Sequence, residues 1–437
     1  MNRHVLSRFA KAALGGLLAL GVFGTLPAAA AAQSIPAGFD CTKAERPVDR
    51  FICAYAVLRW QDLALSRAYA AAKAAAVGPA RDDLIQQQRD WVRERDRRCI
   101  ADRSFKELSS ASSPPAKRAY DCLDMVYLDR RRVLQDLAAP PLLPSTIAPL
   151  ALAPLLAARP DIQVESDLRI AGIQVSPDGT LLAILLPSQE IDLPDQVWLY
   201  RVADGTLVEA TPRPDQQQPH PDDAPMAIQA LAWQGGTLYA HVTLWGPDGS
   251  GNPERNASAV YAATMAGRQK LETVPHAIQA LLDRAAEPEA IDPDEVTAGD
   301  QDAISVLRGN HDFLVWTVDL GRGTIELRTR KRPPPGAPVY RAAWGSWELG
   351  SFLFDAHRSQ IAYAADTGII LLDLATHGDR RIAGTARGDQ PYARSADQSL
   401  LVWSTRNACG DESLTAQNDS APQRFCLAHL TTPKARP

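Results

Sequence analysis

The stretch FDCTKAERPVDRFIC, residues 39–53, has one cysteine near its start and another at its end. Pro47 lies between them and can begin a helix, because the first helical turn leaves its N–H groups unpaired and proline has none to lose. The eleven residues between Cys41 and Cys53 exceed the C-x-x-C spacing of redox sites and the short ligand spacing of zinc sites. We therefore predict a disulfide that links an extended lead to the first helix.

The first 32 residues have the three parts of a secretory signal peptide. A basic start (residues 3–11) precedes an apolar run (residues 12–26) and an alanine tract (residues 28–32) that offers A-x-A cleavage sites. We predict cleavage near Ala32, export to the periplasm or the medium of a bacterial cell, and no stable membrane anchor after cleavage. A retained anchor is the alternative, although the apolar run is shorter than the roughly 20 residues of a membrane span.

Export changes how the cysteines are interpreted. An even number of cysteines in an oxidising compartment indicates disulfides, and pairing between neighbours along the chain is the simplest choice, although the sequence alone does not fix the connectivity. Neither a short ligand spacing nor a histidine cluster accompanies the cysteines, so we expect no metal site and no cofactor. The six cysteines are Cys41, Cys53, Cys99, Cys122, Cys409 and Cys426.

The 437 residues are enough for two or more domains, and their charge is unevenly divided. Residues 38–137 carry a net charge of +4, whereas residues 138–437 carry a net charge of −12. This asymmetry suggests two surfaces with different partners. Neither half has the concentrated basic character of a nucleic-acid-binding protein, so we exclude that class.

The pattern of residues 38–137 predicts a small helical domain. Pro47, Pro79 and Pro114 each stand where a helix can begin, and apolar side chains recur at helical spacing between residues 58 and 69. About 100 residues are few for a self-sufficient core. We expect the two neighbouring cysteine pairs of this half to add roughly 3 kcal/mol of stability each.

The remainder of the chain predicts a linker and an all-β domain. Prolines prevent a long helix in residues 138–163, which we interpret as a Pro/Leu-rich linker whose leucines pack on a domain. In residues 164–433, strand-like alternation and turn signals recur in units that begin near residues 170, 228, 303, 351 and 393. A period of roughly 50–60 residues is that of a four-stranded propeller blade, and a twisted β-sandwich is the alternative.

The clearest of these units contains SPDGTLLAI, residues 176–184. This segment closely resembles the blade signature of TolB-type and WD-like propellers, in which an Asp-Gly turn links the inner strands of a blade. The fold class that we predict is therefore α + β multidomain, with a small disulfide-linked α-helical bundle followed by an all-β, propeller-like domain of about five irregular blades.

An ordered set of residues in the helical half matches a known family. Besides the four cysteines, the set consists of Phe39, Asp40, Asp62, Tyr69, Gln88, Arg89, Trp91 and Arg95. Over residues 39–137 this pattern resembles the N-terminal domain of the LprI-type lysozyme inhibitors. The resemblance implies a small exported helical domain that binds a lysozyme-like muramidase, and we interpret the eight residues as structural. The chain departs from the family in Asp49, where glutamate is usual, and in lacking a lipidation signal before Cys41.

Two arginine clusters are candidates for the inhibitory surface. A glycosidase cleft contains two catalytic carboxylates, so an inhibitor gains by presenting cations to it. The residues alone do not choose between Arg93 and Arg97 in the first cluster and Arg130 and Arg131 in the second. The alternative for the first is a solvated helix face on which nearby acidic residues form local pairs.

Three further residues lie within the apolar helical stripes. Trp60 has charged neighbours and is a candidate anchor at an interface, with core packing as the alternative. For Trp91 core packing is the expectation. Asp62 is expected to form a structural ion pair with Arg89 or Arg95 across the bundle.

Common catalytic motifs such as G-x-S-x-G, H-E-x-x-H and the phosphate-binding loop are missing from the sequence. We therefore predict that the protein is not an enzyme. The leading hypothesis is an exported binding protein whose helical domain inhibits a muramidase and whose β domain binds an unknown second protein or glycan. The alternative is a cell-envelope interaction scaffold that binds a peptide or glycan without inhibiting. A third hypothesis, an enzyme working from a propeller channel, requires convergent carboxylates or histidines there.

Overall fold

The computed structural model describes residues between 37 and 430, which belong to one unit that spans Ile35–Pro437. The predicted signal peptide and its cleavage site near Ala32 lie outside the described residues. In the part of the chain that is described, no helix is long and apolar enough to cross a membrane. Within 37–430 the residues left undescribed are 102, 109–112, 158–169, 171, 187–195, 212–224, 248–252, 286–301, 310–311, 320–323, 330–339, 344–351, 356–359, 374–375, 377, 396, 398 and 414–422.

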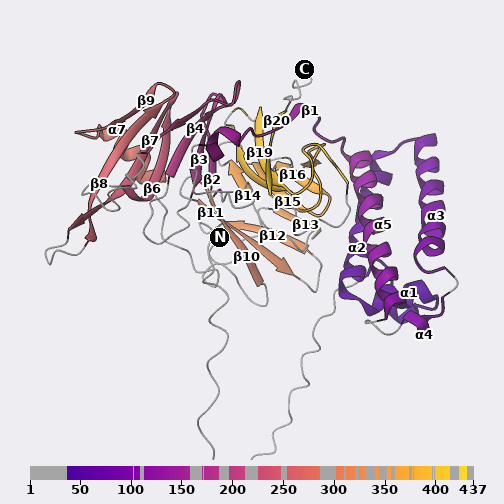
Figure 1. The fold of residues 1–437 in the computed structure, drawn as a ribbon. Coiled ribbons are helices and arrows are strands. Elements are labelled where there is room, and N and C mark those ends of the chain that lie inside the picture. The colour runs from indigo at the N-terminus through magenta and orange to yellow at the C-terminus, as the bar shows by residue number, and fades with distance from the viewer. Residues whose placement is uncertain are drawn as a thin grey trace, which may run out of the picture. The chain divides into compact units, whose positions relative to one another are not determined.

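Helices form the first part of the described chain (Figure 1). They are η1 (Cys41–Lys43), α1 (Pro47–Ala54), α2 (Ala56–Ala75), α3 (Pro79–Cys99), α4 (Phe105–Leu108) and α5 (Pro114–Ala138). Prolines begin α1, α3 and α5, as the sequence predicts, because a proline in the first helical position loses no hydrogen bond. The start of α5 is also capped, since the Ser113 hydroxyl accepts a hydrogen bond from the Ala116 amide. The short helix α4 was not predicted.

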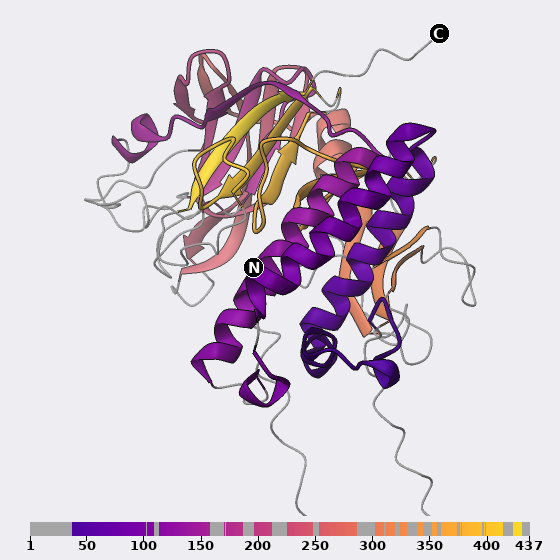
Figure 2. The same cartoon turned by 90° about the vertical axis from the view of Figure 1, so that its right-hand side faces the viewer.

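The long helices α2, α3 and α5 lie side by side and share one apolar core (Figure 2). Leu58 and Leu65 of α2 pack in this cluster with Leu84 of α3 and with Leu123 and Leu134 of α5. Leu58, Leu123 and Leu134 have no exposed surface. The helical periodicity in the sequence therefore marks the buried face of α2 correctly.

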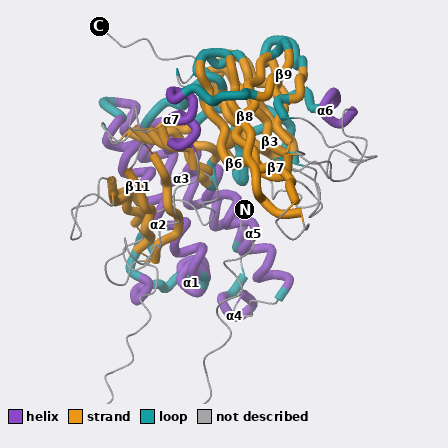
Figure 3. Tube along the Cα trace, turned by 90° about the vertical axis from the view of Figure 1, so that its left-hand side faces the viewer, coloured by secondary structure: helices purple, strands orange, loops and turns teal. Residues whose placement is uncertain are grey.

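The described residues of the β region form five four-stranded antiparallel sheets, and the short helices α6 (Ala153–Ala157) and α7 (His276–Ala285) lie in the same part of the chain (Figure 3). Sheet 1 has β2 (Gly172–Val175), β3 (Leu181–Leu186), β4 (Gln196–Arg201) and β5 (Leu207–Glu209). Sheet 2 has β6 (Pro225–Gln234), β7 (Thr237–Pro247), β8 (Pro253–Thr264) and β9 (Gly267–Lys270). Sheet 3 has β10 (Asp302–Gly309), β11 (Asp312–Asp319), β12 (Thr324–Thr329) and β13 (Tyr340–Ala343).

The last two sheets follow the same plan with one exception. Sheet 4 has β14 (Phe352–Asp355), β15 (Gln360–Ala365), β16 (Gly368–Asp373) and β17 (Gly378–Arg381). Sheet 5 has β18 (Gln390–Arg394), β19 (Leu400–Thr405), β20 (Arg424–Leu430) and, from far upstream, β1 (Pro144–Pro149). The five sheets begin at residues 172, 225, 302, 352 and 390, when β1 is set aside. Each start is within three residues of a unit start predicted from the sequence.

Sheet 5 is completed by a strand from the stretch that we predicted as a linker, residues 138–163. The strand β1 pairs antiparallel with β20 at the edge of the sheet. Its prolines, Pro144 and Pro149, lie at its two ends, where an edge strand tolerates them. Three leucines that follow β1 are buried, as expected of them, and Leu156 packs partly buried against the same cluster, so this part of the stretch belongs to the β region. The buried ones are Leu150, Leu152 and Leu155, whereas Leu143, before β1, is exposed.

The SPDGT turn of the first unit recurs as SADQS, residues 395–399, in the last unit. In the first turn the Ser176 hydroxyl lies 2.6 Å from Asp178 Oδ1, and in the second the Ser395 hydroxyl lies 2.5 Å from Asp397 Oδ1. Each aspartate also accepts a hydrogen bond from the backbone amide two residues later, at 3.1 Å and 3.0 Å. Because both turns join the first strand of a sheet to the second, sheets 1 and 5 repeat one structural unit.

Apolar clusters join neighbouring sheets. One cluster contains residues of sheets 1 and 5, a second contains residues of sheets 1 and 2, and a third contains residues of sheets 4 and 5. Members of these clusters are Leu182 and Leu400, Leu199 and Leu238, and Ile369 and Trp403, respectively. The described chain is thus a helical region followed by several small antiparallel sheets, and apolar clusters join sheets 1, 2, 4 and 5.

The three disulfides pair neighbouring cysteines along the chain, the pairing that is the simplest choice from the sequence. One disulfide joins η1 to α1, the second joins α3 to α5, and the third joins the segment after β19 to β20. All Cα–Cα distances are typical of disulfides. The pairs are Cys41–Cys53 at 5.8 Å, Cys99–Cys122 at 5.4 Å and Cys409–Cys426 at 5.7 Å.

Candidate functional site

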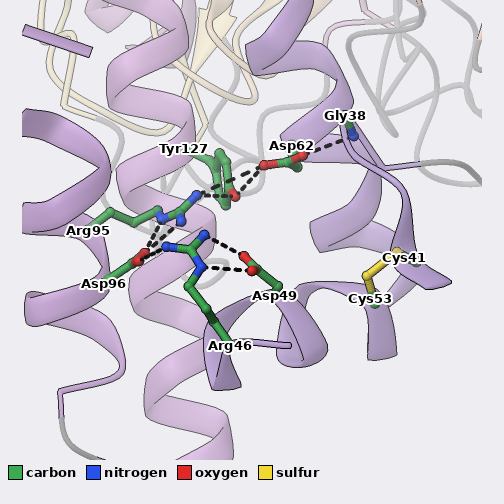
Figure 4. Close-up of polar contacts among 9 residues, drawn as sticks. All are labelled: Gly38, Cys41, Arg46, Asp49, Cys53, Asp62, Arg95, Asp96 and Tyr127. Carbon is green, nitrogen blue, oxygen red and sulfur yellow. Dashed lines mark hydrogen bonds and ion pairs between the residues drawn. A yellow bond between two sulfur atoms is a disulfide. The ribbon is translucent and has the colours of Figure 1, made fainter. Parts of the chain in front are cut away.

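Three buried polar side chains, one from each long helix, meet inside the bundle (Figure 4). The Tyr127 hydroxyl of α5 donates a hydrogen bond to Asp62 Oδ1 of α2 (2.7 Å) and accepts one from Arg95 Nη1 of α3 (2.8 Å). Arg95 Nη1 also lies 4.0 Å from Asp62 Oδ1. Of the two arginines expected to pair with Asp62, the structure thus selects Arg95 and inserts the hydroxyl of Tyr127. We call these three residues the central cluster.

The opening stretch of the sequence is tied to the central cluster by hydrogen bonds (Figure 4). The Gly38 amide donates to Asp62 Oδ2 (2.9 Å). Arg46, just before α1, forms ion pairs with Asp49 of α1 (2.7 Å) and with Asp96 of α3 (2.9 Å). Asp49, which stands where the family usually has glutamate, therefore holds an arginine that links α1 to α3. These contacts tie the N-terminal lead to α2 and the residue before α1 to α3.

Burial governs the protonation of the central cluster. It raises the pKa of the Asp62 carboxyl, and the hydrogen bond from Tyr127 and the charge of Arg95 offset only part of that effect. The pKa of Tyr127 is raised well above its ordinary value, first by burial and then by Asp62. Burial alone would lower the pKa of Arg95, but the neighbouring Tyr127 and the carboxylates of Asp96 and Asp62 outweigh it and raise the pKa. The cluster is a satisfied structural network.

Most other residues of the family pattern also serve the fold. Trp91 packs against the core edge-on to Tyr127, with ring centroids 5.7 Å apart, and the Arg95 guanidinium lies 5.4 Å from the centre of the Trp91 ring. Phe39 and Tyr69 pack against the same core. The Asp40 carboxylate caps η1 by accepting a hydrogen bond from the Thr42 amide (3.0 Å), and Gln88 Oε1 accepts one from Arg130 Nε (2.9 Å).

The arginines of α3 are exposed. The side chains of Arg93 and Arg97 are 71% and 76% exposed, and they form local ion pairs with Asp90 and Glu94, respectively. These are the local pairs that the alternative interpretation of the sequence expects. Arg89 and Arg98 are exposed as well, and neither forms an ion pair with another described residue.

The arginines near the C-terminal end of α5 are engaged inside the molecule. Arg131 is buried, donates a hydrogen bond to Gln61 Oε1 (3.1 Å) and forms an ion pair with Asp366 in the turn between β15 and β16. Its guanidinium lies 5.8 Å from the ring centre of Trp60, which is 1% exposed. Arg131 is buried against Asp366 of the β region, so the prediction that it presents a surface to another protein is wrong in this structure. For Trp60 the alternative of core packing holds.

Sequence reasoning missed the polar role of Tyr127 and the partners of α5. Tyr127 lies at i+4 from Leu123, a spacing that predicts a core residue and says nothing of its hydroxyl. No pattern in the sequence connects Asp366 or Gln61 with Arg131, because their proximity depends on how the chain folds. Among the described residues, no group of three or more His, Cys, Asp or Glu side chains is arranged to hold a metal ion.

Comparison with solved structures gives distant likenesses to parts of other proteins. The structure "AtxE2 Isopeptidase - APO" is 12% identical over 55% of this chain and 43% of that chain, with a TM-score of 0.27. "Crystal Structure of Mitotic Checkpoint Complex" is 10% identical over 64% of this chain and 93% of that chain, with a TM-score of 0.29. At these TM-scores the likenesses carry no argument. No match was found among curated proteins.

A family model gives a more specific result. The model described as "Lysozyme inhibitor LprI" matches residues 41–134. The match spans α1 to α5 and includes the central cluster together with the first two disulfides. The inhibitors of this family are not enzymes. The helical region of this chain is therefore an LprI domain.

Proposed function

We propose that the protein is an exported inhibitor that binds a lysozyme-like muramidase through the exposed face of α3. The single observation that carries this proposal is the match of residues 41–134 to the lysozyme inhibitor family. The three disulfides support export, since such bonds persist in oxidising compartments. Release of the signal peptide near Ala32 is part of the proposal and is tested by N-terminal sequencing of the exported protein.

The choice of α3 rests on which arginines a second protein can reach. In the α5 cluster, Arg131 is buried and Arg130 is half-buried against Gln88. Along α3, by contrast, Arg93 and Arg97 extend into solvent. Exposed side chains at a rim can reorganise when a partner approaches, since local surface pairs contribute little energy.

The proposed chemistry is electrostatic. A muramidase cleft holds two carboxylates that flank the scissile bond. Arg93 and Arg97 lie one helical turn apart, and the further exposed arginines of α3 are Arg89 and Arg98. We infer that this row of guanidinium groups exchanges Asp90 and Glu94 for the cleft's carboxylates, which matches the negative field of the cleft and blocks access of the glycan.

Lysis of bacterial cell walls by lysozyme, followed by turbidity, tests the proposal with the full mature chain. We expect lysis to slow at micromolar concentrations of the protein, and unchanged lysis would contradict the inhibitory role. The double variant Arg93→Ala/Arg97→Ala should lose about tenfold in inhibition, as expected for a charge-matched interface. The matched control is Lys117→Ala/Arg118→Ala, two exposed cations at the start of α5, which should inhibit like the wild type.

We also propose that the five sheets are blades of one propeller. The nearest-neighbour strand order in four sheets, the shared apolar clusters and the completion of sheet 5 by β1 support this arrangement, because propeller blades are four-stranded sheets and β1 brings the start of the β region into its last sheet. A crystal structure decides the matter. If sheets 2 and 3 do not pack against each other there, the ring is open and the proposal fails.

A further inference from the structure

Ion pairs join α5 to the β region, and their charges alternate along the helix. Within 12 residues, or about 18 Å of helix, α5 presents an acid, a base and an acid. The β region meets them with a base, an acid and a base. The pairs are Asp124 with Arg387 (2.9 Å), Arg131 with Asp366, and Asp136 with Arg381 (2.8 Å).

The middle pair is withdrawn from water. The side chain of Arg131 is 2% exposed and that of Asp366 is 10% exposed. Burial raises the pKa of the Asp366 carboxyl, and the charge of Arg131 opposes that effect. A buried charge without a partner is strongly unfavourable, so each member of this pair depends on the other.

Side chains of α2 hold the charges of α5 in position. Gln61 Nε2 donates a hydrogen bond to Asp124 Oδ1 (3.1 Å), and Gln61 Oε1 accepts one from Arg131 Nη1 (3.1 Å). Gln61 is itself 2% exposed. One buried amide therefore orients two of the three α5 charges toward the β region.

The chain that leaves α5 is held at the same place. The Leu142 amide donates a hydrogen bond to the Arg381 carbonyl (2.8 Å), and the Ala383 amide donates one to the Leu142 carbonyl (2.9 Å). Arg381 also forms an ion pair with Glu412 (3.3 Å), whose backbone carbonyl accepts a hydrogen bond from Arg132. The contacts of the ion pairs thus extend to the segment that leads from α5 to the β region.

We propose that the β region is the docking partner of the LprI domain, and that α5 is an intramolecular interface specific for sheet 4 and the segment that follows it. Alternating charges fix the register, because a shift along α5 places like charges opposite each other. The docked face of α5 is closed to other proteins. A partner of the helical domain therefore approaches from the side of α3, and this consequence holds whether or not that partner is a muramidase.

Hydrogen exchange measured by mass spectrometry on the full chain tests the docking. In Arg131→Asp we expect exchange at least about tenfold faster in peptides that cover α5 and β16–β17, because opening exposes both sides of the interface. The charge-swapped double variant Arg131→Asp/Asp366→Arg should return these rates to within about threefold of the wild type. Asp90→Ala is the matched control, since it removes an exposed carboxylate of α3 away from the interface and should leave exchange in both α5 and β16–β17 unchanged.

Two results would overturn the docking proposal. The first is an Arg131→Asp protein whose β16–β17 peptides exchange at the wild-type rate. The second is a double variant that exchanges as fast as the single variant. If Arg131→Asp does not fold, Asp124→Asn provides the test at a less buried pair, where exchange about threefold faster in α5 is expected and an unchanged rate would again refute the docking.

Discussion

Helices α3 and α5 are both rich in arginine, yet the two helices use it in opposite ways. On α3, Arg93 and Arg97 extend into solvent beside acids one turn away. On α5, Arg131 is buried against an acid that lies far along the chain, and Arg132 contacts a backbone carbonyl of the β region. The same residue type thus forms a soluble surface on one helix and a specific internal interface on the other.

The contrast shows that the surroundings of an arginine decide its role. An exposed pair within a helix contributes little, because water competes for both charges. A buried pair between distant segments makes each partner indispensable once both have left water. The following predictions test this contrast between α3 and α5, from the largest expected effect to the smallest.

The largest effect is expected where α3 and α5 share a polar contact, at the central cluster. Asp62→Ala leaves the Tyr127 hydroxyl and the Arg95 guanidinium without their buried acceptor, so the free energy of unfolding should fall by about 4 kcal/mol. Urea unfolding followed by circular dichroism measures it. Asp90→Ala, which removes an exposed carboxylate from α3, should change the value by less than about 0.5 kcal/mol. Similar losses of unfolding free energy in both variants would contradict the claim that the buried cluster and the exposed α3 pairs differ in their contribution to stability.

The disulfide between Cys99 and Cys122 joins the two helices covalently, across a sequence separation of 23. Replacing both cysteines by serine should lower the free energy of unfolding by about 3 kcal/mol, because the unfolded chain regains the freedom of that loop. Thermal unfolding measures the change. The matched variant Cys409→Ser/Cys426→Ser should leave hydrogen exchange in α3 and α5 at the wild-type rate, and faster exchange there would show that the disulfides act jointly.

The pKa values of the carboxylates that pair with the arginines of the two helices are shifted in opposite directions. Burial raises the pKa of Asp366, the partner of Arg131, whereas a hydrogen bond from Arg97 lowers the pKa of Glu94. Because folded Asp366 keeps its proton above the unfolded pKa near 3.9, its contribution makes stability fall as pH rises from that value through the raised pKa. The Glu94 pair acts oppositely, since its small contribution is lost as pH falls through the lowered pKa.

Urea unfolding at a series of pH values between about 3.5 and 6.5 measures this slope. Asp366→Asn should be less stable at every pH, because Arg131 loses its partner, but the downward slope due to Asp366 should disappear. The control is Glu94→Gln, in which that slope should persist. A slope that survives in Asp366→Asn would assign it to another group.

The smallest effect on stability is expected at the exposed arginines of α3. Arg97→Ala removes a surface pair with Glu94, so the free energy of unfolding should change by less than about 0.5 kcal/mol. Chemical unfolding checks this value beside Arg131→Ala, for which a loss of at least about 3 kcal/mol is expected. A loss above about 1 kcal/mol in Arg97→Ala would mean that the α3 face is part of a structural interface after all.

Local features of the fold were predictable from the sequence. The helix starts at Pro47, Pro79 and Pro114 follow from the missing amide of proline, which costs no hydrogen bond in the first helical turn wherever the helix lies. The unit starts in the β region follow from turn residues, and the SPDGT turn repeats its hydrogen bonds in sheet 5. By contrast, β1 was not predicted, because a short segment flanked by prolines forms a strand only when it pairs with β20, which lies far along the chain.

The candidate site was predictable only in part. The pairing of Asp62 with Arg95 was among the expectations, since both lie at inward positions of helices in the family pattern. Trp60 was a candidate surface anchor because of its charged neighbours, with core packing as the alternative, and Arg131 was a candidate because it belongs to an arginine cluster. The β region buries Arg131 instead, and its contact with α5 leaves no local trace in the sequence.

The sequence by itself determined the starts of the helices and the period of the β units, because these depend on neighbours along the chain and on the geometry of single residues. The tertiary structure decided which arginines are free to meet another protein and which hold the two parts of this chain together. The physical reason is that the energy of a charge depends on how much water and which opposite charges surround it, and folding alone brings Asp366 to Arg131 while leaving Arg93 in solvent.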